Sequence, residues 1–151
     1  MADWNDVDIL LAEDSDADVE IILRAFRKSG LTNKVFRVHD GDEAIQFLRR
    51  EGPFAHRDPT TPRLIILDIK MSRLNGIDAL QKLRSDEETR STPVVMLTSS
   101  VQEQDMLGSY ALGVTGYLVK PVQAEAFSQL VIQGGLHWIV LKDSVSRQPR
   151  C

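Results

Sequence analysis

Short apolar runs alternate with amphipathic segments along the whole chain. Several of the runs are apolar at nearly every position, a pattern typical of strands that are buried on both faces of a parallel sheet. The runs cover residues 8–12, 34–38, 63–67, 93–97 and 115–119. Strands that alternate with helices in this way predict a doubly wound α/β domain with a five-stranded parallel sheet, helices on both faces and right-handed crossovers.

Between the predicted strands, apolar residues recur at a spacing of three or four, which predicts amphipathic helices. Two of these helices begin with a capping arrangement, Ser15 with Asp18 and Asp40 with Glu43. The Pro- and Thr-containing segment 51–63 is predicted to be an exposed, mobile loop. The helical stripes are Val19, Ile22, Leu23 and Phe26; Ala44, Phe47 and Leu48; Ala79, Leu80 and Leu83; Leu107, Tyr110 and Ala111; and Phe127, Leu130 and Val131.

The composition argues against several classes of protein. The chain has 151 residues, of which 42% are hydrophobic and 26% charged, as in an ordinary globular domain with a sizeable core. The net charge is −4 without a basic block, so nucleic acid is not an expected partner. No apolar stretch has the length of a membrane span and the first residues do not resemble a signal peptide, so a cytoplasmic location is expected. The single cysteine, Cys151, excludes disulfides and cysteine-based metal sites within one chain.

Polar residues follow the predicted strands. In an open α/β sheet, ligands bind just outside the carboxyl ends of the strands. We therefore expect these polar residues to meet at one edge of the sheet. They are Glu13 and Asp14 after the first strand, Asp68 after the third, Thr98, Ser99 and Ser100 after the fourth, and Lys120 followed by Pro121 after the fifth.

The chemistry of such a cluster suggests phosphoryl transfer. Neighbouring carboxylates repel one another unless a cation compensates, and a set of oxygen ligands without His or Cys suits a hard cation such as Mg²⁺. A metal and a lysine around a carboxylate can neutralise the charge on a transferring phosphoryl group, while a carboxylate can act as the nucleophile. The apolar run that ends at Asp68 would hold this carboxylate rigidly at the edge of the sheet.

In this order and on these strand ends, the residues Glu13-Asp14, Asp68, Thr98 and Lys120-Pro121 resemble the signature of response-regulator receiver domains, the CheY-like superfamily. The resemblance covers residues 7–133 and implies a flavodoxin-like strand order, 2-1-3-4-5. It implies a signalling switch rather than an enzyme. Asp68 would accept a phosphoryl group from the phosphohistidine of a sensor histidine kinase.

The same resemblance implies a metal site and a switch. Mg²⁺, with Ca²⁺ or Mn²⁺ as substitutes, would bind to the set Glu13, Asp14, Asp68 and the backbone carbonyl of Lys70. Lys120 would pair with the phosphoryl oxygens and Thr98 would hydrogen-bond to the phosphoryl group. Tyr117 matches the aromatic residue that swings inward when the threonine moves. Pro121 would follow a cis peptide bond.

The loop after Asp68 departs from the family pattern in part. Ser72 stands where the family usually has a proline, which favours a less rigid loop, whereas Gly76 matches the glycine of the family. The side chain of Lys70 could shield the phosphoryl group from water and slow self-dephosphorylation. The alternative is a solvated lysine that lends only its carbonyl.

Residues 134–151 form a C-terminal extension with a dense apolar stretch. It either folds back on its own domain or buries its apolar face on another chain, and we favour a symmetric homodimer. The predicted dimer contacts are Leu136, Trp138, Ile139 and Leu141. The extension and the stretches QEQDML and SYALGV are similar to the stand-alone regulators associated with phytochrome-type photoreceptor kinases of bacteria and cyanobacteria, so a bacteriophytochrome is the expected kinase.

Three other functions were compared with this interpretation. A phosphorelay intermediate would pass its phosphoryl group on to a downstream histidine phosphotransfer protein, and this alternative stays open. A phosphatase with an aspartyl nucleophile usually needs a second acid two residues after the nucleophile. This chain has Lys70 there, which argues against a phosphatase. A phosphorylation-independent binding module would not need the intact set Asp14, Asp68 and Lys120.

Overall fold

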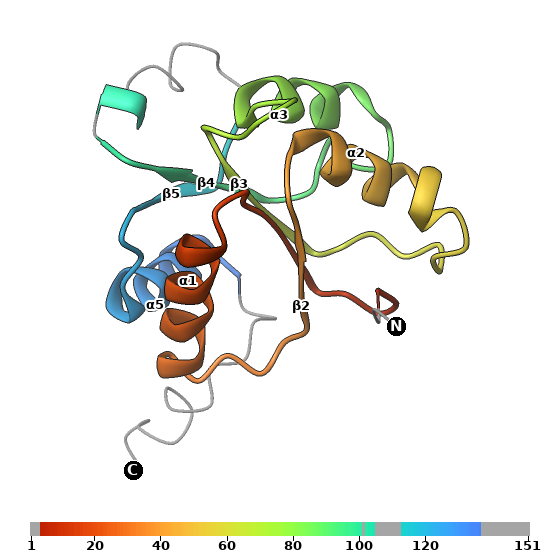
Figure 1. Ribbon diagram of the computed structural model, residues 1–151. Coiled ribbons are helices and arrows are strands. Elements are labelled where there is room, and N and C mark those ends of the chain that lie inside the picture. Colours follow the sequence, from red (N-terminus) through yellow and green to blue (C-terminus); the bar gives the residue numbers. More distant parts are fainter. Residues whose placement is uncertain (1–3, 101, 105–112, 137–151) are drawn as a thin grey trace.

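The computed structural model describes residues 4–100, 102–104 and 113–136 (Figure 1). Five parallel strands form one sheet in the order β2-β1-β3-β4-β5. This arrangement confirms the predicted doubly wound, flavodoxin-like topology. The strands are β1 (Ile9–Ala12), β2 (Val35–Val38), β3 (Leu64–Asp68), β4 (Val94–Thr98) and β5 (Gly116–Val119).

Helices cover both faces of the sheet. Figure 1 shows α1 and α5 on one face and α2 and α3 on the other. None of the helices in the described part of the chain has the length and hydrophobicity that crossing a membrane requires. The helix predicted from the stripe Leu107, Tyr110 and Ala111 lies outside the described residues. The helical elements are α1 (Asp16–Lys28), α2 (Gly41–Arg49), η1 (Gly52–Phe54), α3 (Gly76–Ser85) and α5 (Ala124–Gln133).

The strand residues divide between two hydrophobic cores because successive side chains of a strand point to opposite faces. Leu10, Leu67 and Met96 pack beneath α2 and α3. Leu11 and Ile66 pack on the opposite side, beneath α1 and α5. Strands β1, β3 and β4 are therefore buried on both faces, which explains why their sequences are apolar at consecutive positions.

Two predicted helix caps are present. The Ser15 hydroxyl accepts a hydrogen bond from the backbone N–H of Asp18 at 3.2 Å. The Asp40 carboxylate accepts one from the N–H of Glu43 at 2.8 Å. Because the first cap starts α1 directly after β1, the short Glu13-Asp14 connection is held at the carboxyl edge of the sheet.

The segment 51–63, predicted to be an exposed loop, is largely exposed, but the side chains of Phe54 and Arg57 are buried. Phe54 is only 5% exposed and its ring packs against the rings of Phe47 and Trp4, with centroids 5.1 and 5.5 Å apart. Arg57 is 4% exposed, and its guanidinium carbon lies 4.2 Å from the centroid of the Phe47 ring. The segment covers the end of the core beside β2, so its proline and threonine residues surround two anchored side chains.

Candidate functional site

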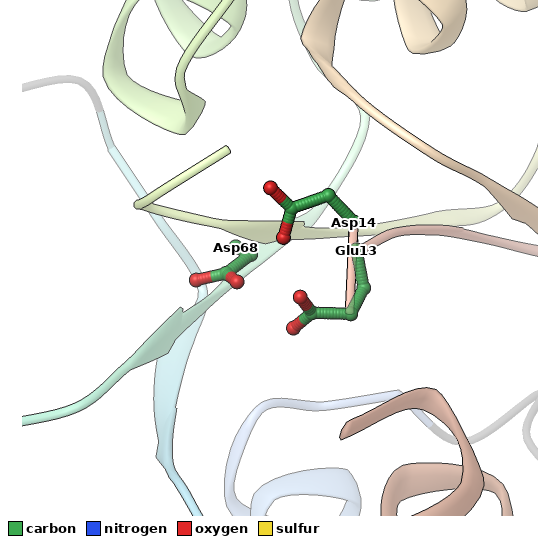
Figure 2. A group of neighbouring side chains, drawn as sticks. All are labelled: Glu13, Asp14 and Asp68. Atoms are coloured by element: carbon green, nitrogen blue, oxygen red, sulfur yellow. The ribbon is translucent and has the colours of Figure 1, made fainter. Parts of the chain in front are cut away.

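Three carboxylates meet at the carboxyl edge of the sheet. Figure 2 shows the side chains of Glu13, Asp14 and Asp68 turned toward a common space. One carboxylate oxygen from each residue lies within 4.8 Å of the others. Glu13 is fully buried and Asp68 is 3% exposed, whereas Asp14 is exposed. Two of the three charges are therefore largely removed from water, which is favourable only if cations compensate them.

The ammonium of Lys120 lies inside this acidic cluster. Its Nζ is 2.7 Å from Asp68 Oδ2, 2.6 Å from Glu13 Oε1 and 2.9 Å from Asp18 Oδ2. From the sequence, Asp18 was predicted only to take part in the cap of α1. Its backbone N–H does serve the cap, but its carboxylate reaches Lys120. Asp18 lies in the first turn of α1, which begins at the carboxyl edge of the sheet. This position was the only indication in the sequence that its carboxylate could reach the site.

Thr98 and Lys120 are joined by the backbone. The N–H of Lys120 donates to the carbonyl oxygen of Thr98 at 2.8 Å, and the Lys120–Pro121 peptide bond is cis. Thr98 is fully buried at the end of β4, one residue beyond the pairing of Asp68 with Leu97. Tyr117 is half-buried and packs against the core beneath α2 and α3.

The loop after Asp68 is fixed by backbone contacts. A Cβ atom at Gly76 would lie 2.2 Å from the carbonyl oxygen of Asp68, so only glycine fits at this position. The N–H of Lys70 donates to Asp68 Oδ1 at 3.3 Å. The N–H of Ser72 donates to Asp14 Oδ2 at 3.1 Å. A proline at position 72, as in the usual family pattern, would have no N–H for this hydrogen bond.

Burial and charge shift two pKa values in this cluster. Burial, together with the hydrogen bond to Asp68, raises the pKa of Glu13 to about 7. Burial alone would lower the pKa of Lys120, but its close contacts with the carboxylates of Asp68, Glu13 and Asp18 outweigh this effect and raise it. Lys120 is therefore a permanent cation at neutral pH, while Glu13 can still take up a proton.

The donor set fits a hard divalent cation. It consists of oxygen atoms alone, which Mg²⁺ and its relatives prefer. Within the described residues, the buried Glu13 Oε1 accepts no well-directed hydrogen bond, although the ammonium of Lys120 lies close to it. A cation at the common space of Glu13, Asp14 and Asp68 would satisfy this oxygen and reduce the repulsion among the three carboxylates.

Glu103 is a site residue that the sequence analysis missed. Its Oε1 accepts a hydrogen bond from the backbone N–H of Ser99 at 2.7 Å, and its Oε2 lies 3.1 Å from Lys70 Nζ. The Ser99 hydrogen bond is the main reason why the pKa of Glu103 lies below its ordinary value, and Lys70 adds to it. The spacing of Ser100 and Glu103, typical of a helix cap, was the only signal in the sequence.

Of the four predicted dimer contacts, only Leu136 lies within the described residues. Leu136 is 3% exposed and packs in the core beneath α1 and α5, and its N–H donates to the Val131 carbonyl oxygen at 3.1 Å. Its side chain therefore leaves little surface for a second chain. Trp138, Ile139 and Leu141 lie outside the described residues.

The chain matches a known family over most of its length. Residues 9–132 match the response regulator receiver domain, so the chain belongs to this family. Receiver-domain response regulators are signalling switches, and receiver domains bind a divalent metal. The fold and the edge cluster described above are thus those of a response regulator of a two-component system.

Two known proteins illustrate the range of its relatives. The probable methanogenesis regulatory protein FilR2 of Methanothrix harundinacea is 33% identical over 132 residues, which cover 87% of this chain and 83% of that protein. The response regulator Rcp1 of Synechocystis sp. is 33% identical over 112 residues, which cover 74% of this chain and 75% of that protein.

Solved structures place the chain close to phytochrome response regulators. The bacteriophytochrome response regulator RtBRR has a TM-score of 0.84 and 46% identity, over 89% of this chain and 81% of that chain. The bacteriophytochrome response regulator AtBRR has a TM-score of 0.82 and 39% identity, over 89% of this chain and 96% of that chain. The Mn²⁺-bound form of Rcp1 has a TM-score of 0.67 and 29% identity, over 89% of this chain and 94% of that chain.

Proposed function

We propose that this chain is a response regulator that accepts a phosphoryl group on Asp68 from a sensor histidine kinase of the phytochrome type. The contact between Lys120 and Asp68, 2.7 Å long within a cluster of carboxylates, is the observation that carries this proposal. It supplies a buried carboxylate with a fixed cation where a phosphoryl group would arrive. The likeness to RtBRR and AtBRR supports a bacteriophytochrome as the kinase.

The chemistry is the transfer of one phosphoryl group. An oxygen of the Asp68 carboxylate attacks phosphorus, the bond from phosphorus to the kinase histidine nitrogen breaks, and an acyl phosphate forms. The ammonium of Lys120 pairs with a phosphoryl oxygen. A bound Mg²⁺ would be held by Glu13, Asp14, Asp68 and the carbonyl of Lys70, and would neutralise charge on the phosphoryl oxygens. Attack of water on the acyl phosphate returns the free carboxylate and inorganic phosphate.

The phosphoryl group would act as a switch through its charge. It carries close to two negative charges and offers new hydrogen-bond acceptors beside Thr98. A hydrogen bond from the Thr98 hydroxyl, followed by an inward movement of Tyr117, would bias an equilibrium between two conformations. The output would be a changed binding surface in the cytoplasm.

We also propose that the chain forms a homodimer through its C-terminal extension. The sequence has large apolar residues at Trp138, Ile139 and Leu141, which a symmetric partner would cover. Because Leu136 is buried in the core of its own domain, the dimer contacts would begin beyond this residue.

A small phosphodonor tests the phosphoryl acceptor directly. The protein is incubated with acetyl phosphate and Mg²⁺ and resolved on a phosphate-affinity gel. We expect a retarded band for the wild type and none for Asp68→Asn. Asp86, at the C-terminal end of α3, provides the matched control, because Asp86→Asn removes a carboxylate at the opposite edge of the sheet and should keep the retarded band. A wild type that is never retarded would contradict the proposal.

A further inference from the structure

Glu103 connects the two loops that border Asp68. One of its carboxylate oxygens accepts a hydrogen bond from the N–H of Ser99, directly after β4, at 2.7 Å. The other lies 3.1 Å from the ammonium of Lys70, in the loop after β3. The Glu103 side chain is only 11% exposed, whereas the side chain of Lys70 is 75% exposed. The carboxylate is thus held between two positively polarised donors at the rim of the acceptor site.

A simple helix cap does not account for both contacts. In a capping box, the glutamate would reach back to the N–H of the cap residue, here Ser100, whose hydroxyl accepts the N–H of Glu103 at 3.3 Å. Glu103 instead reaches one residue further, to Ser99, and also meets Lys70. The position of its carboxylate is therefore determined by groups at the strand ends as well as by the helix start.

Both donors held by Glu103 are neighbours of the acceptor. The backbone N–H of Lys70 already donates to Asp68 Oδ1 at 3.3 Å. Ser99 follows Thr98, whose hydroxyl accepts a weak contact of 3.5 Å from the side-chain amide of Gln104. The segment around residues 102–104 thus folds back onto the groups that a phosphoryl group on Asp68 would need.

We propose that Glu103 is an internal anionic competitor of the phosphoryl group, holding the Ser99 N–H and the Lys70 ammonium until phosphorylation displaces it. The inference rests on the proposed phosphorylation of Asp68. A group with close to two negative charges repels the nearby carboxylate and offers better acceptors for the same donors. Glu103 is then a positioning residue: its release frees the Lys70 ammonium and the Ser99 N–H for the phosphoryl group.

Two substitutions at position 103 separate charge from hydrogen bonding. Glu103→Gln keeps an oxygen that accepts the Ser99 N–H and removes only the charge, whereas Glu103→Ala removes both. We expect the affinity for beryllofluoride with Mg²⁺, measured by ¹⁹F NMR, to rise about fivefold in Glu103→Gln, as removal of a like charge a few ångströms away predicts. We expect a larger rise in Glu103→Ala, because the Ser99 N–H is also freed.

A double-mutant cycle tests the contact with Lys70. While Glu103 holds the ammonium, Lys70→Met should change the beryllofluoride affinity little. In the Glu103→Gln background the ammonium is free to pair with the phosphoryl mimic, so Lys70→Met should then lower the affinity clearly. Equal effects of Lys70→Met in the two backgrounds would refute the shared role of the pair.

The matched control is Glu88→Gln. Glu88, whose side chain is more exposed than that of Glu103, forms an ion pair with Arg50 at 3.3 Å, beyond the C-terminal ends of α2 and α3 at the opposite edge of the sheet. This variant should bind beryllofluoride like the wild type. Affinities of Glu103→Gln and Glu103→Ala within twofold of the wild type would overturn the inference. A wild type that binds no beryllofluoride would instead refute the proposed function itself.

Discussion

Lys120 Nζ lies 2.7 Å from Asp68 Oδ2, although the two residues are 52 positions apart and the whole of β4 lies between their strands. The long lysine side chain spans the end of β4 and places its charge on the acceptor carboxylate. Because Glu13 and Asp18 contact the same ammonium, one cation is shared by three carboxylates. The site is therefore under-compensated before a divalent metal binds.

Removal of this ammonium should destabilise the metal-free protein. Lys120→Met leaves the buried carboxylates of Glu13 and Asp68 without their cation, which should lower the free energy of unfolding at pH 8 by roughly 3 kcal/mol. Mg²⁺ should restore more stability in this variant than in the wild type, because the cation then compensates a larger charge. Urea unfolding with Mg²⁺ and with a chelator measures both quantities.

The control for this experiment is Lys28→Met, which removes an exposed lysine from the last turn of α1. Its effect should stay within about 0.5 kcal/mol, with or without Mg²⁺. An equal stabilisation by Mg²⁺ in Lys120→Met and in the wild type would contradict the compensation argument.

Glu13 should give the metal-free protein a characteristic pH dependence. Its pKa is raised from the ordinary 4.5 to about 7, so the folded protein holds this proton more tightly than the unfolded chain. The resulting stability is fully present below pH 4.5 and is lost as the pH rises through about 7. At about 1.4 kcal/mol for each pKa unit, the loss amounts to roughly 3 kcal/mol.

Urea unfolding between pH 4.5 and 8 in the presence of a chelator measures this loss. The isosteric variant Glu13→Gln should show a smaller decrease over the same range. The carboxyls of Asp86 and Glu103 have lowered pKa values, so their contributions are lost only at lower pH and do not overlap with this window. Parallel curves for the wild type and Glu13→Gln would show that Glu13 does not titrate in this range.

Gly76 should be intolerant of any side chain. Gly76→Ala places a Cβ atom 2.2 Å from the carbonyl oxygen of Asp68, so the backbone that carries the acceptor must move. We expect a loss of roughly 3 kcal/mol in the free energy of unfolding and slower phosphorylation by acetyl phosphate. Gly113→Ala is the control: φ is +66° there, but the Cβ meets no other described atom within 4 Å, so the cost should be about 1 kcal/mol of backbone strain.

Dimerisation through the C-terminal extension should depend on its aromatic residue. Trp138→Ala should shift the protein from dimer to monomer in sedimentation velocity experiments at micromolar concentration. Ile132, which is 69% exposed on α5 just before the extension, provides the matched control. If Ile132→Ala dissociates the protein and Trp138→Ala does not, the interface lies on α5 rather than on the extension.

The strands and their order could be predicted because their signals are local. Each buried strand is a nearly continuous apolar run, and the polar residues that end β1, β3, β4 and β5 meet at one edge through the topology alone. Asp68 and Lys120 could thus be paired from the sequence once the sheet was recognised. The two helix caps at Ser15 and Asp40 could also be predicted, because a cap depends only on residues a few positions apart.

The missed contacts depend on tertiary structure. Asp18 and Glu103 both occupy positions typical of a helix cap, and that local role concealed the second role of each carboxylate. The partner of Asp18 is Lys120, 102 positions away in the sequence, and a local sequence pattern cannot predict so distant a contact. Phe54 and Arg57 were missed for the opposite reason: the proline and threonine residues around them are typical of a loop, yet these two side chains close the core.

The central claim is that Asp68 forms an acyl phosphate, and peptide mass spectrometry of the protein treated with acetyl phosphate and Mg²⁺ tests it most directly. We predict one added phosphoryl group, located on the peptide that contains Asp68 and absent when Mg²⁺ is chelated. A phosphoryl group located on any other residue, or a chain that stays unmodified with Mg²⁺ present, would contradict the account.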